Sequence, residues 1–410
     1  MDAFIARQPI FDRRLEVHAY ELLFRSGLKD FFDHPDPDQA SSKVIADSLL
    51  LPGLDSLTGG RPAFINVTRE LLVGDGISLL PASTTVVEVL ETVEPDSEVL
   101  EACRRLKSKG YLLAFDDFAA GSPWEPWLGL ADIVKVDVLA SGPAERAALA
   151  RRFKHAGPKL VAEKVESQAI HLETSALGYQ YFQGFFFERP TTLSARDIPT
   201  SKYHEVQLLR EVHKPGLDFP ALEGIIEHEV GLSYKLLRYI NAAFFGWHGS
   251  VESIQHALML LGEREIRNWA SVVIMAGMAD DKPDELVTQA LMRGRHCELL
   301  AHAAGLESRA HDLFLMGTFS LIDAILDCPL ASVLREIPIA TDVKDALLGE
   351  PGPLRDLFTV VVAYAGGDWA LVSERAKRLG LDEPAIPACY VEALHWCDES
   401  LERNVNRPAA

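Results

Sequence analysis

Residues Tyr111–Phe118 read YLLAFDDF, and this stretch predicts the fold of the first half of the chain. The apolar run Leu112–Phe115 is typical of a strand that is buried on both faces. Two adjacent carboxylates, Asp116 and Asp117, follow it directly. Buried acids are costly to desolvate unless they are paired, and divalent metal ions are common partners. A loop with two hydrated acids is the alternative that this stretch alone leaves open.

The composition is that of a globular protein with more than one domain. At 410 residues, with 48% hydrophobic and 24% charged residues, the chain is expected to form two domains with substantial cores. No apolar run approaches the roughly 20 residues of a transmembrane helix, and the N-terminus lacks the pattern of a signal peptide. Five scattered cysteines without a CxxC pair predict neither a disulfide framework nor a zinc site. We therefore expect a cytoplasmic protein.

The net charge limits the partners of the chain. A formal charge of −20 argues against non-specific binding to nucleic acid or to an anionic membrane. An anionic substrate would have to be drawn in by local cations against this overall field. No nucleic-acid or membrane partner is expected.

In the first half, up to about residue 190, short β-type runs alternate with helical stretches. Phe4–Ile10 and Val17–Phe24 are joined by a polar turn and predict a hairpin, and Ser41–Leu50 has helical spacing. Besides Leu112–Phe115, the expected later strands are Pro62–Val67, Thr84–Leu90, Ile133–Val138, Lys159–Ala162 and Tyr179–Phe182. Strands alternating with helices predict a parallel α/β sheet closed into a barrel. Because of the hairpin, we expect a modified TIM barrel with one antiparallel strand.

Polar residues recur at the ends of these strands. They are Glu21, Asn66, Glu88, Glu91, Asp116, Asp117, Lys135, Asp137, Glu163, Glu166 and Gln183. The carboxyl ends of the strands of a parallel barrel converge on one mouth, where such a set would form an all-oxygen site suited to Mg²⁺, Mn²⁺ or Ca²⁺. Two metal ions and an oriented water are a standard arrangement for splitting a phosphodiester. Taken singly, several of these residues have an alternative as helix-start, edge-strand or turn residues.

The order ELLFR, FIN, VEVLE, DDF, KVD, AEKVE, QG resembles the EAL family of cyclic-di-GMP phosphodiesterases over roughly residues 1–195. The resemblance implies hydrolysis of cyclic-di-GMP to pGpG with two Mg²⁺ or Mn²⁺ ions. The metal ligands that it implies are Glu21, Asn66, Glu88, Asp116, Asp117 and Glu163. It also implies catalytic roles for Lys135, Glu163, Glu91 and Glu166, with Lys135 positioning the attacking water and Glu91 and Glu166 holding the active-site loop. The residues expected to contact substrate are Arg25, Gln183 and Asp137.

The sequence departs from that family at three places. The signature is Glu-Leu-Leu and not Glu-Ala-Leu, and Lys164 replaces the usual glycine of AEGVE. The loop Ala119–Trp127 replaces the usual FGTG and serine pair, and in the family this loop couples metal binding to dimerisation. The divergence bears on turnover more than on substrate binding.

The second half, after a polar junction at Pro190–Tyr203, shows only helical spacing. The helices are expected at Glu205–Val212, Phe219–Glu229, Ser233–Ala243, Ser253–Leu261, Glu263–Met278, Asp284–Ala303, Leu313–Ile325, Ser332–Ile337, Asp342–Leu348, Leu354–Tyr364, Trp369–Leu379 and Pro387–Ser400. We expect an all-helical domain at residues 196–410, after a barrel at residues 1–195.

Residues 232–270 of this half resemble an HDOD domain, a relative of the HD metal-dependent phosphohydrolases. The position of the HD pair holds Ser320 and Leu321. His311 and Asp312 form an HD dipeptide that falls nine residues earlier, and we interpret it as a capping pair before a helix. His296 and His302 are six residues apart, which is poor geometry for a shared metal. The resemblance therefore implies a sensing or protein-interaction module without hydrolase activity.

Three hypotheses follow from the sequence. The first is a bacterial phosphodiesterase that acts on cyclic-di-GMP and is regulated through its HDOD domain. The second is a receptor that binds the dinucleotide and turns it over poorly. The third, a scaffold with neither function, conflicts with the complete set of clustered acids. A homodimer and a protein partner of the HDOD domain are also expected.

Overall fold

The computed structural model describes residues 4–25, 53–74, 76–153, 157–189, 202–228, 236 and 254–404. The chain forms two compact units: Met1–Phe187 with Val362–Glu374, and Glu188–Val361 with Arg375–Ala410. The expected helix Ser41–Leu50 and the expected boundary at residue 195 lie outside the described residues.

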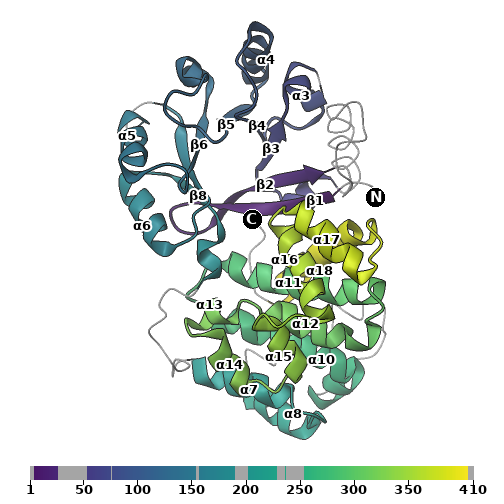
Figure 1. Ribbon diagram of the computed structural model, residues 1–410. Helices are drawn as coiled ribbons and strands as arrows, with labels where there is room; N and C mark the ends of the chain where they lie inside the picture. The colour runs from purple at the N-terminus through teal and green to yellow at the C-terminus, as the bar shows by residue number, and fades with distance from the viewer. Residues whose placement is uncertain are drawn as a thin grey trace. The chain divides into compact units, whose positions relative to one another are not determined.

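The first unit is a closed eight-stranded barrel, drawn in purple to teal in Figure 1. Strand β1 pairs antiparallel with both β2 and β8, and the other neighbouring pairs are parallel. The predicted modified TIM barrel is therefore confirmed. The strands are β1 (Phe4–Phe11), β2 (Val17–Arg25), β3 (Ala63–Val67), β4 (Thr85–Val89), β5 (Leu112–Phe115), β6 (Ile133–Asp137), β7 (Lys159–Glu163) and β8 (Tyr181–Gln183).

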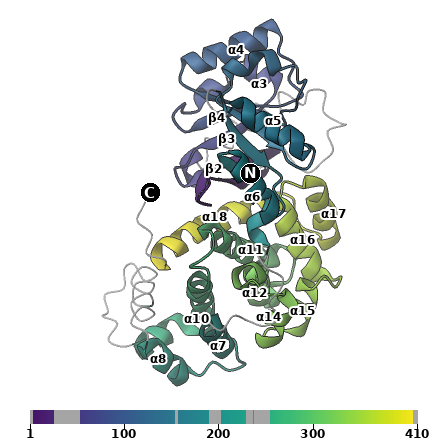
Figure 2. The ribbon, with the colours of Figure 1, turned by 90° about the vertical axis from the view of Figure 1, so that its left-hand side faces the viewer.

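Helices surround the strands, as Figures 1 and 2 show. Thr68 caps the helix after β3 by accepting a hydrogen bond from the Leu71 amide, and Gly110, at φ 93°, follows the helix before β5. Thr68 thus marks the start of one helix and Gly110 the end of another. The helices of the barrel are α2 (Leu54–Thr58), α3 (Arg69–Val73), α4 (Ser97–Ser108), α5 (Pro143–Phe153) and α6 (Gln168–Leu177).

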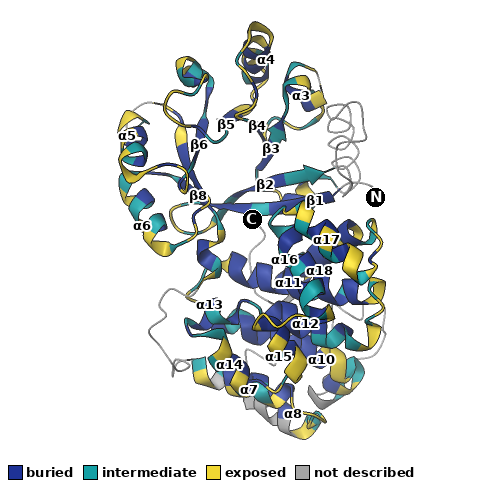
Figure 3. Cartoon of the chain, in the orientation of Figure 1, coloured by how far each residue is buried: buried dark blue, intermediate teal, exposed yellow. Residues whose placement is uncertain are grey.

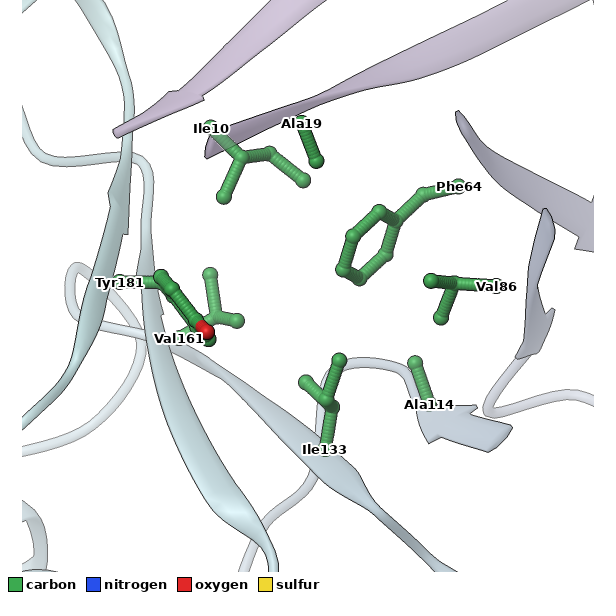
Figure 4. Packing of buried hydrophobic residues seen from close by; sticks show 8 residues of the cluster. All are labelled: Ile10, Ala19, Phe64, Val86, Ala114, Ile133, Val161 and Tyr181. Atoms are coloured by element: carbon green, nitrogen blue, oxygen red, sulfur yellow. The ribbon is translucent and has the colours of Figure 1, made fainter. Parts of the chain in front are cut away.

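One layer of apolar side chains fills the barrel interior, with one residue from each strand. Figure 4 shows these side chains pointing toward one another, and Phe64 is the largest that is completely buried. Burying a side chain of that size stabilises the fold by about 1.5–3 kcal/mol. The layer consists of Ile10, Ala19, Phe64, Val86, Ala114, Ile133, Val161 and Tyr181.

A segment from far along the chain completes the first unit. The backbone N–H of Ile5 donates to the Tyr364 hydroxyl at 3.1 Å, and that hydroxyl donates to the Ile5 carbonyl at 2.9 Å. The ring of Trp369 packs against Phe4 with centroids 5.9 Å apart. Residues Val362–Glu374 therefore cover β1 as an integral part of this unit.

The second unit is helical throughout its described residues, and Figure 3 shows α11 buried along most of its length. Gly262, at φ 75°, kinks α10 where a break is predicted. The single helix expected at Leu313–Ile325 is two helices in the structure. The helices of this half of the chain are α7 (Tyr203–Val212), α8 (Phe219–His228), α10 (Ile254–Met278), α11 (Asp284–Ala303), α12 (Ala310–Phe319), α13 (Ile322–Leu326), α14 (Leu330–Glu336), α15 (Thr341–Leu347), α16 (Pro353–Ala365), α17 (Trp369–Leu379) and α18 (Ala385–Asn404). The end of α16 and the first part of α17 belong to the first unit. Among the described residues, no helix combines the length and apolarity needed to span a membrane.

Candidate metal centre at the barrel mouth

A polar layer lies directly above the apolar layer of the barrel. Because side chains alternate along a strand, the residue two positions further on each parallel strand returns to the interior. In β1, which runs the other way, the matching residue lies two positions earlier. The polar layer consists of Gln8, Glu21, Asn66, Glu88, Asp116, Lys135, Glu163 and Gln183.

Lys135 lies among the acids of this layer and is 1% exposed. Its Nζ lies 3.0 Å from Glu21 Oε2, 2.6 Å from Glu163 Oε1 and 3.4 Å from Asp116 Oδ1. It also contacts Glu88 Oε1. Burial lowers the pKa of Lys135, but the four carboxylates outweigh burial and raise it well above its ordinary value. Lys135 is therefore a fixed ammonium at the centre of the layer.

The buried acids differ in their pKa. Burial raises the pKa of Glu21, but Lys135 and hydrogen bonds from Gln183 and Asn66, both at 2.8 Å, outweigh burial and lower it. Burial, with the charge of Glu21, raises the pKa of Glu88 well above its usual range. Burial raises the pKa of Glu163 to about 8 against the opposing charge of Lys135. The layer thus holds more negative charge than one lysine compensates.

Several buried oxygen atoms of the mouth have no hydrogen-bond partner among the described residues. They are Asn66 Oδ1, Glu88 Oε2, Asp117 Oδ1, Glu163 Oε2 and Gln183 Oε1. Buried polar atoms are normally paired, so a set left open at one place indicates a missing ligand. Carboxylate and amide oxygens are the donors that Mg²⁺ and Mn²⁺ prefer. The residues present therefore fit a divalent cation.

Two groups of acids have oxygen atoms close enough to share an ion. In the inner group, one oxygen each from Glu21, Glu88 and Glu163 lie within 4.8 Å of one another. In the outer group, the same holds for Asp116, Asp117 and Glu163. Glu163 belongs to both groups, so the two candidate positions are adjacent.

The outer edge of the mouth carries two further charged residues. Lys164 Nζ lies 2.6 Å from Asp137 Oδ2 and 3.6 Å from Asp117 Oδ2. Burial raises the pKa of Asp137, but the hydrogen bond from Lys164 and those from the Ala140 and Leu139 amides outweigh it. The structure thus brings Asp137 to the mouth, where it is paired with Lys164.

Three predicted site residues lie further out. Glu91 and Glu166 are exposed, each on the loop that follows its strand. Arg25 ends β2, and its Nε is buried without a partner among the described residues. The structure does not bring these three into the polar layer, and their predicted roles stay predictions.

The loop Ala119–Trp127, in which the sequence leaves the EAL pattern, is anchored in the barrel. Trp124 is 3% exposed, its Nε1 donates to the Val93 carbonyl at 2.8 Å, and its ring packs on Phe115 with centroids 4.5 Å apart. Glu125 accepts a hydrogen bond from the Gly121 amide at 3.1 Å. The tryptophan thus fixes the loop directly behind the paired aspartates.

Gln8 is the member of the polar layer that the sequence interpretation missed. Its Oε1 accepts a hydrogen bond from Gln183 Nε2 at 3.1 Å, and Gln183 Nε2 also donates to Glu21. Its own Nε2 donates to the Gly366 carbonyl at 3.2 Å. Counting two positions backward from the apolar Ile10 of an antiparallel strand would have identified it.

The helical unit presents no comparable group of ligands among its described residues. The expectation that His311 and Asp312 precede a helix is wrong, because α12 begins at Ala310 and both residues lie in its first turn. Neither is the N-cap; Asp312 instead forms an ion pair with Arg309 at 2.6 Å. The N-cap is Arg309, whose side chain makes no capping hydrogen bond, so the sequence carries no signal for this helix start. His296 Nε2 is hydrogen-bonded to the Ile386 carbonyl at 3.2 Å, and His302 is exposed.

Comparisons with known proteins cover nearly the whole chain. The HDOD domain family matches residues 198–332. The cyclic di-GMP phosphodiesterase CdgJ of Vibrio cholerae is 32% identical over 399 residues, which are 97% of this chain and 92% of that protein. The Bacillus subtilis protein YuxH is 32% identical over 410 residues, 98% of this chain and 100% of that protein.

Solved structures resemble this chain over a shorter span. An EAL domain protein from Listeria monocytogenes is 22% identical, with a TM-score of 0.38, and the match covers 45% of this chain and 87% of that one. Klebsiella pneumoniae BlrP1 in a manganese and cyclic-di-GMP complex is 24% identical, with a TM-score of 0.40, and covers 45% of this chain and 55% of its own. On the strength of its full-length relatives, this chain belongs to the family of cyclic-di-GMP phosphodiesterase-related proteins that join an EAL barrel to an HDOD domain.

Proposed function

We propose that this protein hydrolyses cyclic-di-GMP to pGpG at the mouth of its barrel, in a reaction that depends on Mg²⁺ or Mn²⁺. The observation that carries the proposal is the set of unpartnered buried oxygens around Lys135. A cluster of acids with open oxygens has a large cost unless cations complete it. Its relative CdgJ, similar over nearly the full length, is a phosphodiesterase for the same dinucleotide.

The residues of the mouth divide into three tasks. Glu21, Asn66, Glu88, Asp116, Asp117 and Glu163 would hold the ions. Divalent ions bound there would withdraw charge from the phosphodiester and make water a better nucleophile. Lys135, fixed by its carboxylate contacts, donates a hydrogen bond that orients the attacking water. Glu163, which contacts Lys135, accepts the proton that this water loses.

Substrate contacts are assigned to residues around this centre. Gln183 lies beside Glu21 and keeps Oε1 open toward the mouth. Arg25 is the last residue of β2 and Asp137 the last residue of β6, and we assign them to the phosphate and the base of the dinucleotide. Glu91 and Glu166 are assigned to holding the loops at the rim.

A receptor that retains the dinucleotide without turning it over is the second candidate. Lys164 favours it, because its ammonium reaches both Asp117 and Asp137 at the outer edge of the mouth. The two candidates share the binding site and differ only in whether product forms.

Hydrolysis by the purified full chain distinguishes these candidates. We expect pGpG to form slowly with Mg²⁺ or Mn²⁺ and not with EDTA, and Glu21→Ala or Lys135→Ala to abolish it. Lys107→Ala is the matched control, because Lys107 pairs with Asp132 on the outside of the same barrel. Tight binding of cyclic-di-GMP without product at any metal concentration would establish the receptor and overturn the enzyme.

We further propose that the protein forms a homodimer and that its HDOD domain binds a protein partner. The resemblance of the chain to the EAL and HDOD families motivates both proposals. Sedimentation of the full chain with and without cyclic-di-GMP tests the dimer, which a monomer under both conditions would contradict.

A further inference from the structure

Lys164 occupies an unusual place at the mouth. It directly follows Glu163, and its backbone has φ 53°, in the left-handed region that disfavours a side chain. Its side chain is about half exposed, yet its Nζ lies 2.6 Å from Asp137 Oδ2 and 3.6 Å from Asp117 Oδ2. A strained backbone therefore places an ammonium between two acids, Asp137 at the end of β6 and Asp117 just after β5.

The acids around this ammonium are themselves fixed. Asp137 Oδ1 accepts hydrogen bonds from the Leu139 and Ala140 amides at 2.7 and 3.0 Å, which leaves Oδ2 directed at Lys164. Asp117, at φ 40°, is also held in a left-handed backbone. The acids that contact the Lys164 ammonium are therefore held in fixed positions.

The inner and outer groups of acids differ in their relation to this charge. The inner group (Glu21, Glu88 and Glu163) keeps Glu88 Oε2 and Glu163 Oε2 open, while Lys135 contacts the opposite oxygens of the same two carboxylates. The outer group (Asp116, Asp117 and Glu163) also keeps an open oxygen, Asp117 Oδ1, but it faces two ammoniums: Lys164 reaches Asp117, and Lys135 reaches Asp116 and Glu163. A divalent ion in the outer group would be repelled by both ammoniums, whereas an ion in the inner group would be repelled by Lys135 and lie farther from Lys164.

We propose that Lys164 takes the place of a second divalent cation, so that this protein binds one ion tightly in the inner group and a second only weakly. The inference rests on the proposed function, since it assigns the ions of that same site. It makes Lys164 the residue that sets the metal stoichiometry and gives a physical reason for slow turnover.

Titration of Mn²⁺ into the metal-free full chain tests this inference without substrate. We expect one tight ion per wild-type chain and a second that binds at least about tenfold more weakly. Lys164→Gly removes the charge and suits the left-handed backbone, so it should strengthen the second ion by at least about tenfold. A spin-coupled manganese pair should then appear in the electron paramagnetic resonance spectrum of the variant.

Two further variants separate charge from backbone. Lys164→Arg keeps the positive charge and should behave like the wild type. Lys164→Asn tolerates the left-handed backbone without the charge and should behave like Lys164→Gly. If the second Mn²⁺ ion binds more tightly to Lys164→Gly but not to Lys164→Asn, the effect comes from backbone strain and the charge argument is overturned.

The outcomes also separate this inference from the proposed function. Two equally tight ions in the wild type, or an unchanged second ion in Lys164→Gly, would overturn the role of Lys164 and leave the phosphodiesterase proposal standing. No Mn²⁺ bound by any of the four proteins would overturn both, beginning with the metal site itself.

Discussion

The barrel mouth and the interior of the helical unit both bury titratable groups, but they treat them in opposite ways. At the mouth, Lys135 faces four carboxylates, and several oxygens stay open. In the helical unit, burial keeps His213 and His296 neutral, and each has a hydrogen-bond partner, Ser271 Oγ at 2.9 Å and the Ile386 carbonyl at 3.2 Å. The difference teaches that buried charge without matching partners indicates a binding site, whereas buried neutral histidines indicate packing.

The largest effect is expected from removing the ammonium at the mouth. Lys135→Met leaves buried carboxylates without their common partner, and breaking a buried pair in this way costs about 3–5 kcal/mol. Urea unfolding in EDTA measures the loss. Lys107→Met is the control, since the partly exposed pair of Lys107 and Asp132 contributes about 1 kcal/mol or less. Equal losses in the two variants would remove the contrast between the mouth and an ordinary surface pair.

The helical unit should respond to acid in the way of buried neutral histidines. Burial lowers the pKa of His296 to about 4, so the unfolded chain takes up a proton first, near its ordinary value of 6.5. The stabilisation is complete above pH 6.5 and is lost as the pH falls toward 4, by about 2 kcal/mol at pH 5. Comparing the wild type with His296→Gln at pH 7.5 and pH 5 isolates this loss. A pH-independent difference between the two proteins would show that His296 is not buried in its neutral form.

At the mouth, removing an acid should raise the free energy of unfolding of the metal-free protein, whereas removing the lysine lowers it. Glu88 is completely buried, and burial together with the charge of Glu21 raises its pKa. Glu88→Gln keeps the shape and removes the charge, so the metal-free protein should gain about 1–2 kcal/mol in unfolding free energy. The gain should grow with pH, because a raised carboxyl pKa destabilises the fold as the pH rises.

The same Glu88→Gln variant should lose its tight Mn²⁺ site and its hydrolysis. Urea unfolding in EDTA and Mn²⁺ titration measure the two effects on one preparation. A variant that is both less stable and still metal-binding would place Glu88 in the packing of the barrel and outside the metal site.

The smallest effect is expected at Gln8. Its amide connects the Gly366 carbonyl with Gln183, which in turn donates to Glu21. Gln8→Leu breaks both bonds and should reduce stability by about 1 kcal/mol. Because Glu21 loses an orienting neighbour, hydrolysis should fall by about tenfold, through kcat more than KM. Gln180→Leu, on the same barrel at the start of β8, is the control, and its hydrolysis should be unchanged. Unchanged kcat in Gln8→Leu would show that Gln8 does not position Glu21.

Much of the fold and of the site could be predicted from the sequence, because each parallel strand carries a polar residue near its carboxyl end or directly after it. The alternation of strands and helices predicts the barrel, and the polar ends identify Glu21, Asn66, Glu88, Lys135 and Glu163. In these strands the polar residue lies two positions after the residue of the apolar layer, because side chains alternate along a strand. This count fails for Gln8 only because β1 is antiparallel and reverses the direction in which the residues must be counted.

Other features depend on contacts between distant parts of the chain, which a local sequence pattern does not predict. The reach of Lys164 to Asp117 and Asp137 follows from a left-handed backbone that the sequence does not announce. The packing of Val362–Glu374 on β1 joins residues more than 350 positions apart, while the helical spacing of that segment is the same wherever it packs.

A diffraction experiment at the manganese absorption edge, on crystals of the full chain grown with Mn²⁺, tests the central claim most directly. The account predicts a strong anomalous peak in the inner group, among Glu21, Glu88 and Glu163, with Lys164 still beside Asp137. Well-ordered density in which Lys135 keeps its carboxylates and no peak appears at the mouth would contradict it.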